Sequence, residues 1–127
     1  MVNKMKILES AENYLETILI LHNKKGSVRS IDIANELEYS KPSVSIAMKR
    51  LRENGYIDVK PDGYIELTET GKKVAESIYE RHTILTECLT LIGVSKETAE
   101  DDACKVEHII SEETFCAIKD VLKKHKH

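Results

Sequence analysis

The pattern of apolar and polar positions predicts a mainly helical chain with one β-hairpin. A helical pattern runs over residues 68–93 and predicts one long helix of roughly 20 residues. Two short alternating runs, 56–60 and 64–67, flank Pro61-Asp62-Gly63, and this arrangement is typical of a hairpin. A first amphipathic helix is expected over 7–22, with an inward stripe of Leu8, Ala11, Leu15, Ile18 and His22.

A short helix is expected directly after the first one. Ser30 is a natural N-cap for it, because a serine side chain accepts a hydrogen bond from a free backbone amide. The helix would end at the turn Glu38-Tyr39. The residues expected to face inward are Ile31, Ala34 and Leu37.

The next helix is predicted over residues 41–54, capped by Ser40 and ended by Gly55. Its apolar face is Val44, Ala47, Met48 and Leu51, and its opposite face is polar. Helix, short helix, turn, helix and hairpin is the order of a winged helix-turn-helix. The side chains expected to contact DNA are Arg29, Ser40, Lys41, Pro42, Ser43, Ser45, Ile46, Lys49 and Arg50.

The charge is unevenly distributed along the chain. The formal net charge is −3, yet residues 22–60 hold eight Lys or Arg and five Asp or Glu. The remaining residues hold 11 basic and 17 acidic side chains, a balance of −6. A basic half beside an acidic half fits a DNA-binding face beside a metal-binding or partner-binding face.

The composition indicates a cytoplasmic protein. No apolar run approaches the roughly 18 residues that a membrane span needs, and the first residues do not resemble a secretion signal. Three cysteines without a Cys-x-x-Cys pair indicate reduced thiols. We expect Cys88 and Cys116 to be small core residues.

A candidate metal site lies in the helix that Ser95 is expected to cap. Glu100, Cys104, Glu107 and His108 are spaced so that one continuous helix would project all four from one side. Their side chains offer the oxygen, sulfur and nitrogen donors that bind transition metals. The alternative is a solvated polar face with one half-buried thiol. A final helix is expected to begin after Ser111.

Five segments of the chain share a pattern with one known family. They are 12–18, 40–45, 67–72, 80–82 leading to 91–94, and 103–108 followed by 111–113. In this order they resemble the diphtheria-toxin-repressor and manganese-transport-regulator family of metal-dependent repressors. The resemblance implies a homodimer that binds operator DNA when loaded with Fe²⁺ or Mn²⁺ and controls metal homeostasis genes. Since the chain stops at His127, we expect the C-terminal SH3-like β-barrel of longer members to be absent.

The resemblance also implies a ligand set. His82, Cys104, Glu107 and His108 match ligand positions, Glu16 matches a ligand of the manganese branch, and Glu100 an ancillary ligand of the iron branch. The chain departs from the pattern at Asn13, where manganese members have Asp, and at Thr86, where the iron branch has an acidic residue. The Cys104 thiolate favours Fe²⁺, because sulfur is a softer donor than Mn²⁺ prefers, whereas Glu16 and the expected absence of the barrel favour Mn²⁺. We expect Fe²⁺ to be preferred, with Mn²⁺ also able to activate.

Two other classes of function compete with this one. An enzyme using Cys104 and His108 as nucleophile and base would lack an oxyanion hole, and the chain has no glycine-rich phosphate loop, so neither catalysis nor a small organic substrate is expected. The remaining alternative is a winged-helix transcription factor that senses a signal other than metal. The sequence thus predicts a winged-helix DNA-binding domain, 1–70, and a helical metal-binding and dimerisation domain, 71–127.

Overall fold

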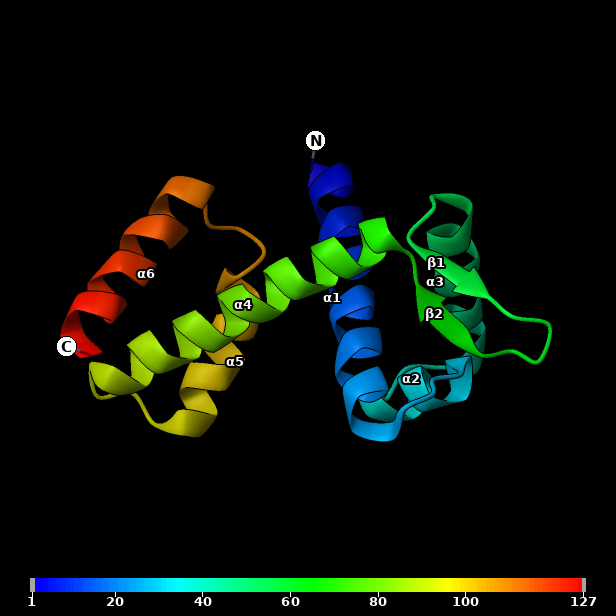
Figure 1. Cartoon of the computed structure of the whole chain (residues 1–127), viewed down its shortest axis with the longest axis horizontal. Helices are drawn as coiled ribbons and strands as arrows, with labels where there is room; N and C mark the ends of the chain where they lie inside the picture. The colour runs from blue at the N-terminus through cyan, green and yellow to red at the C-terminus, as the bar shows by residue number, and fades with distance from the viewer. Residues whose placement is uncertain (1, 127) are drawn as a thin grey trace. The chain divides into compact units, whose positions relative to one another are not determined.

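The computed structural model describes the backbone of residues 2–126 and the side chains of residues 10–125. Within that range the chain forms helices and one two-stranded sheet, as the sequence predicts (Figure 1). None of the described helices has both the length and the apolar composition needed to cross a membrane. The elements are α1 (Val2–Lys25), α2 (Ser30–Leu37), α3 (Lys41–Glu53), β1 (Ile57–Val59), β2 (Ile65–Leu67), α4 (Glu69–Leu91), α5 (Lys96–Val106) and α6 (Glu112–Lys126).

The chain divides into two compact units, Met1–Glu76 and Ser77–His127, and α4 continues from the first into the second. In the first unit Leu15 and Ile18 of α1 are fully buried, as expected, whereas His22 is exposed and Leu21 is buried instead. The Leu8 side chain lies outside the described residues. The core that α1 shares with the other elements comprises Leu15, Ile18, Leu21, Val28, Ile33, Ala34, Val44, Met48, Leu51, Ile57, Ile65 and Ala75.

The start of α2 differs from the prediction in two respects. The N-cap is Arg29 rather than Ser30, because the Asp32 carboxylate reaches back to accept the Arg29 backbone amide at 2.9 Å. The Lys25 ammonium, 2.8 Å from Asp32, is the main reason that the pKa of this carboxyl lies below its usual range. The inward stripe runs through Ile33, Ala34 and Leu37, and Ile31 is exposed. Apolar residues at 31, 33, 34 and 37 allow two helical registers, and packing selects the one through Ile33.

The start of α3 and the hairpin follow the prediction. Ser40 caps α3 by accepting the Ser43 amide at 3.3 Å, and Gly55 leaves the helix with a φ of 81°. Strands β1 and β2 pair antiparallel, with Asp58 opposite Glu66. The Ile65 amide also donates to the Val28 carbonyl at 2.7 Å, which joins the hairpin to the segment before α2. These contacts build the wing onto the helix-turn-helix.

The second unit packs α5 and α6 against α4 through a small apolar core. Ile78 and Leu85 of α4 are buried, as are Phe115 and Leu122 of α6. Ala99 and Ala103 are fully buried on α5, so small side chains give that helix its inward face. Ser95 and Ser111 cap α5 and α6, as predicted. The expectation that two cysteines lie in the core is wrong, since Cys116 is exposed and Cys88 is half-buried.

Thr68 fixes the beginning of α4 against the wing. Its hydroxyl accepts the Gly71 amide at 3.1 Å and donates to the Gly55 carbonyl at 2.6 Å. Gly71 is buried, and a Cβ on it would overlap the backbone carbonyl of Tyr56. A glycine is therefore required here by close backbone approach rather than by helix propensity.

Gly71→Ala should destabilise the protein by more than about 1 kcal/mol, although alanine in a helix is ordinarily about 1 kcal/mol better than glycine. The clash with the Tyr56 carbonyl causes the loss. Urea unfolding measures it, with Thr70→Ala in the same exposed turn as the control. A Gly71→Ala variant as stable as the parent would show that α4 does not pack this closely.

Candidate metal centre and nucleic-acid interface

Three side chains of the second unit that carry metal-ligand atoms lie close together at the end of α5. Glu107 is the C-cap of that helix and its side chain is 0% exposed. His82 of α4 places Nδ1 3.5 Å from Glu107 Oε1. His108 places Nε2 3.8 Å from the same oxygen, and its side chain is 1% exposed. One buried carboxylate oxygen therefore faces two imidazole nitrogens.

The helix that carries this cluster is shorter than predicted. It ends at Val106, and the amides of Ile109 and Ile110 both donate to the Val106 carbonyl, which tightens the chain into a turn. The expectation of one continuous helix face from Glu100 to His108 is therefore wrong. Glu107 continues the buried face of Ala99 and Ala103, because its amide still donates to the Ala103 carbonyl at 2.9 Å. Glu100 and Cys104 are exposed on α5.

The chemistry of the cluster fits a divalent transition metal. Neither carboxylate oxygen of Glu107 accepts a hydrogen bond from the described residues, and a buried polar group without one costs free energy. Two ligands that share an ion at about 2.0–2.2 Å lie about 3–3.5 Å apart, close to the His82–Glu107 spacing. Imidazole nitrogen and carboxylate oxygen suit Mn²⁺, Fe²⁺ and their neighbours. Among the described residues, His82 and Glu107 belong to a group with the spacing of metal ligands, and His108, Glu100 and Cys104 do not.

The remaining predicted ligands lie on α1, in the first unit. The Glu16 side chain is buried, with a relative exposure of 6%, which is unusual for a carboxylate. Asn13 is half-buried one turn earlier, and its backbone carbonyl accepts the Thr17 hydroxyl at 2.8 Å. Between them, Tyr14 contacts Tyr39 edge to face, with ring centroids 6.0 Å apart.

The predicted DNA-contacting residues are all exposed in the first unit. Val44, Met48 and Leu51 hold α3 on the core, and Ala47 beside them is half-buried. Ile46 is 57% exposed on the outer face. The guanidinium of Arg29 stacks 4.2 Å above the ring of Tyr64, the residue directly before β2. The outward face of α3 thus has a charged and hydroxyl-bearing surface with one apolar side chain, which is what base-edge and phosphate contacts use.

Two family models match the chain, one for each part. Residues 6–65 match the N-terminal DNA-binding domain of the iron-dependent repressors, and residues 68–127 match their metal-binding and dimerisation domain. The transcriptional regulator MntR of Escherichia coli O6:H1 is 38% identical over 117 residues, which are 92% of this chain and 76% of the relative. The chain belongs to the iron-dependent repressor family.

Other members of the family extend this comparison. The diphtheria toxin repressor of Corynebacterium diphtheriae is 31% identical over 118 residues, 92% of this chain and 52% of that protein. A solved structure described as a manganese-dependent transcriptional repressor in complex with manganese has a TM-score of 0.82 at 25% identity, covering 89% of this chain and 52% of that one. The chain thus spans about half the length of these two. The family consists of metal-dependent transcriptional regulators and not of enzymes.

The substitution Glu107→Gln should separate the free-energy cost of burying the carboxylate from the contribution of that carboxylate to metal binding. The amide has the same shape and no charge, so the variant should unfold in chelator at the same temperature as the parent or higher. It should lose most of the stabilisation that Mn²⁺ gives the parent, which is about 2.7 kcal/mol at 100 times the dissociation constant. Thermal unfolding with and without Mn²⁺ measures both. An undiminished response to Mn²⁺ would exclude Glu107 as a ligand.

Proposed function

We propose that this protein is a cytoplasmic repressor that binds operator DNA as a homodimer when loaded with Fe²⁺ or Mn²⁺, and that it controls genes of metal homeostasis. The observation that carries the proposal is the buried Glu107 carboxylate facing two imidazoles, inside the segment that matches a metal-binding and dimerisation domain. We assign residues 1–70 to DNA binding and 71–127 to metal binding and dimerisation.

The proposed ligands are His82, Glu107 and His108, joined by Glu16 from α1. The three second-unit residues are supported by the distances from Glu107 Oε1 to His82 and to His108. Glu16 is supported by the burial of its carboxylate and by its match to a ligand of the manganese branch. Further ligands proposed from the family resemblance are Asn13, Glu100 and Cys104.

The proposed mechanism couples this ligand set to the recognition helix. A bound divalent cation supplies the positive charge that offsets the buried carboxylates of Glu16 and Glu107. Within the first unit, Tyr14 on α1 contacts Tyr39, which directly precedes the Ser40 cap of α3. A fixed α1 therefore also fixes the start of the recognition helix. The two recognition helices of a dimer must lie about 34–36 Å apart, or a multiple of that, to enter successive major grooves.

Lys49→Ala and Arg50→Ala should each weaken binding to duplex DNA of any sequence, because both side chains are exposed on α3 and phosphate contacts carry little sequence information. The slope of log affinity against log salt should fall by about one for each phosphate contact that a substitution removes. Fluorescence anisotropy over a salt series measures this. The control is Glu53→Ala on the same helix, which should not weaken binding. Unchanged affinity and slope in both variants would show that α3 is not the DNA-binding face.

The proposed dimer uses apolar surface at the ends of α4 and α6. Phe115 and Leu122 are buried inside the second unit and so cannot serve an interface, and Leu89 and Ile118 are half-buried. Ile92 and Val121 are 72% and 63% exposed and remain available to a second copy. Burying such residues contributes roughly 1.5–3 kcal/mol for each side chain.

Sedimentation of the metal-free protein at micromolar concentration should therefore give about twice the chain mass of 14.4 kDa. Val121→Glu should shift it toward the monomer, because a dimer would place the new carboxylate in an apolar contact. Lys123→Gln, exposed on the same helix, changes the charge by the same amount and is the control. A parent that stays monomeric on DNA would contradict the homodimer.

We propose that Cys104 determines which of the two metals the protein prefers. A thiolate gains more from Fe²⁺ than from Mn²⁺, so we propose Fe²⁺ as the preferred ion, with Mn²⁺ also activating. Cys104→Glu replaces the soft donor by a hard one and should shift activation of DNA binding toward Mn²⁺. Anaerobic titrations with each metal measure the shift, and Cys116→Ser, an exposed cysteine on α6, is the control. An unchanged preference would remove Cys104 as the selectivity determinant.

The alternative is a winged-helix regulator that responds to a signal other than metal. In that case the first unit would still bind DNA, and the second unit would serve only as a dimer interface. This alternative predicts DNA binding that chelator does not change. Metal analysis of the purified protein before and after chelation distinguishes the two proposals.

A further inference from the structure

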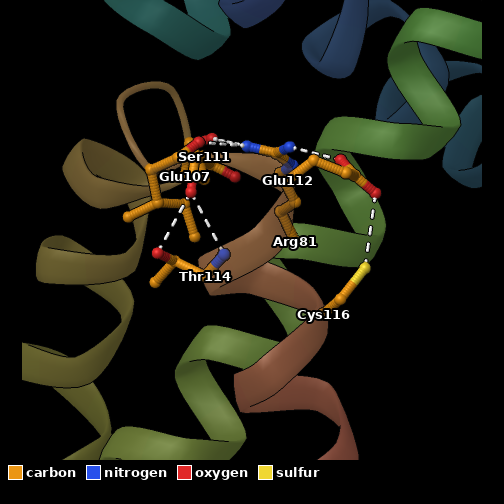
Figure 2. A network of polar contacts seen from close by, with 7 residues as sticks. Arg81, Glu107, Ser111, Glu112, Thr114 and Cys116 are labelled. Carbon is orange, nitrogen blue, oxygen red and sulfur yellow. Dashed lines mark hydrogen bonds and ion pairs between the residues drawn. The ribbon is translucent and has the colours of Figure 1, made fainter.

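The turn that carries Glu107 and His108 is held by one side chain of α4. Arg81 Nη1 donates to the backbone carbonyls of Glu107 at 3.2 Å and Ile110 at 3.0 Å. Its Nη2 donates to Glu112 Oε2 at 2.8 Å. Figure 2 shows the guanidinium between the turn and the start of α6. One side chain thus joins both ends of the turn to the next helix.

These contacts meet a need that the end of α5 creates. The carbonyl of the C-cap residue Glu107 has no partner within α5, and the carbonyl of Ile110 lies beyond the helix, so both depend on donors from outside it. Arg81 is 14% exposed at its side chain and lies 5.2 Å from the Phe115 ring. A guanidinium offers five donors in a rigid fork, so it can bind three acceptors at once, which a lysine ammonium on its flexible stem does poorly.

The acceptor on α6 is itself anchored. Glu112 Oε1 accepts the Cys116 thiol at 3.6 Å, one turn further along the helix. Desolvation and the neighbouring Glu112 carboxylate raise the pKa of this thiol. The Ser111 hydroxyl accepts the Thr114 amide at 3.1 Å and caps α6. Arg81 therefore holds the turn to a helix start that is already fixed.

We infer that Arg81 is a positioning residue for the metal centre: it fixes the backbone of the 107–110 turn, so that Glu107 and His108 face His82, its own neighbour on α4. This inference rests on the proposed metal-dependent function. Groups that orient metal ligands typically change metal affinity by about 10- to 100-fold when they are removed.

The test compares Co²⁺ binding by the full chain and by Arg81→Gln, using the visible absorption of the bound ion. The variant should bind Co²⁺ at least about 10-fold more weakly, with a changed spectrum, since loosened ligands alter the coordination geometry. The control is Glu80→Gln, which breaks the 2.7 Å ion pair with Lys119. That pair also joins α4 to α6 but does not touch the turn, so the control should bind Co²⁺ as the parent does.

A second readout needs no metal. Hydrogen exchange of the amides of Ile109 and Ile110, which both donate to Val106, should be faster in Arg81→Gln and unchanged in Glu80→Gln. If the Gln variant does not fold, Arg81→Lys takes its place. Lysine keeps the positive charge but lacks the forked donor geometry of the guanidinium. This variant should therefore also bind Co²⁺ more weakly than the parent does.

The outcomes separate the metal-dependent function from the positioning role. A parent that binds no Co²⁺ contradicts the proposed metal-dependent function. A parent that binds, with Arg81 variants within twofold of it, overturns only the positioning role. Equal losses of Co²⁺ affinity in Arg81→Gln and Glu80→Gln also overturn that role, because they would reflect general docking of α4 on α6.

Discussion

A carboxylate buried at the end of a helix is the constraint around which the second unit is organised. Glu107 is fully buried, and its Oε1 lies 3.5 Å from His82 Nδ1 and 3.8 Å from His108 Nε2. Such a group is costly to bury without hydrogen bonds or a cation. The second unit accepts this cost where α5 stops and the chain turns. Apolar packing and serine caps on α3, α5 and α6 stabilise the rest of the protein.

The first unit has the complementary task of presenting a DNA-reading helix. Its core holds α1, α2, α3 and the hairpin together, so the apolar face of α3 is packed and its outer face is left for contacts. The contact between Tyr14 and Tyr39 links the part of α1 that carries Glu16 to the residues that begin α3. In the proposed mechanism, this contact transmits a change in the position of α1 to the start of α3.

Local signals explain why much of this fold was predictable. The caps at Ser40, Ser95 and Ser111, the stop at Gly55 and the alternating hairpin residues act within a few positions of themselves. The predictions failed where contacts between residues far apart in the sequence determine the local structure. The end of α5 at Val106 depends on a turn that binds Arg81, 26 residues away in sequence from Glu107. The register of α2 was ambiguous in its pattern and was settled by packing of Ile33.

The candidate ligands were found partly by residue chemistry and partly by family resemblance, and Arg81 was missed as a functional residue. A pattern of Cys, Glu and His donors marks ligands directly. An arginine that acts through backbone carbonyls leaves no pattern, because its partners are carbonyls that every residue has. Only the folded turn shows which of them it binds.

The central claim is that metal at the Glu107 cluster controls DNA binding, and linkage gives its most direct test. A duplex selected from a random pool in Mn²⁺ should bind the parent much more tightly in Mn²⁺ than in chelator. The same duplex should raise the affinity of the protein for Mn²⁺ by the same factor, because coupling between two sites is reciprocal. Equal DNA affinity with and without metal, together with an Mn²⁺ affinity that DNA does not change, would contradict the account.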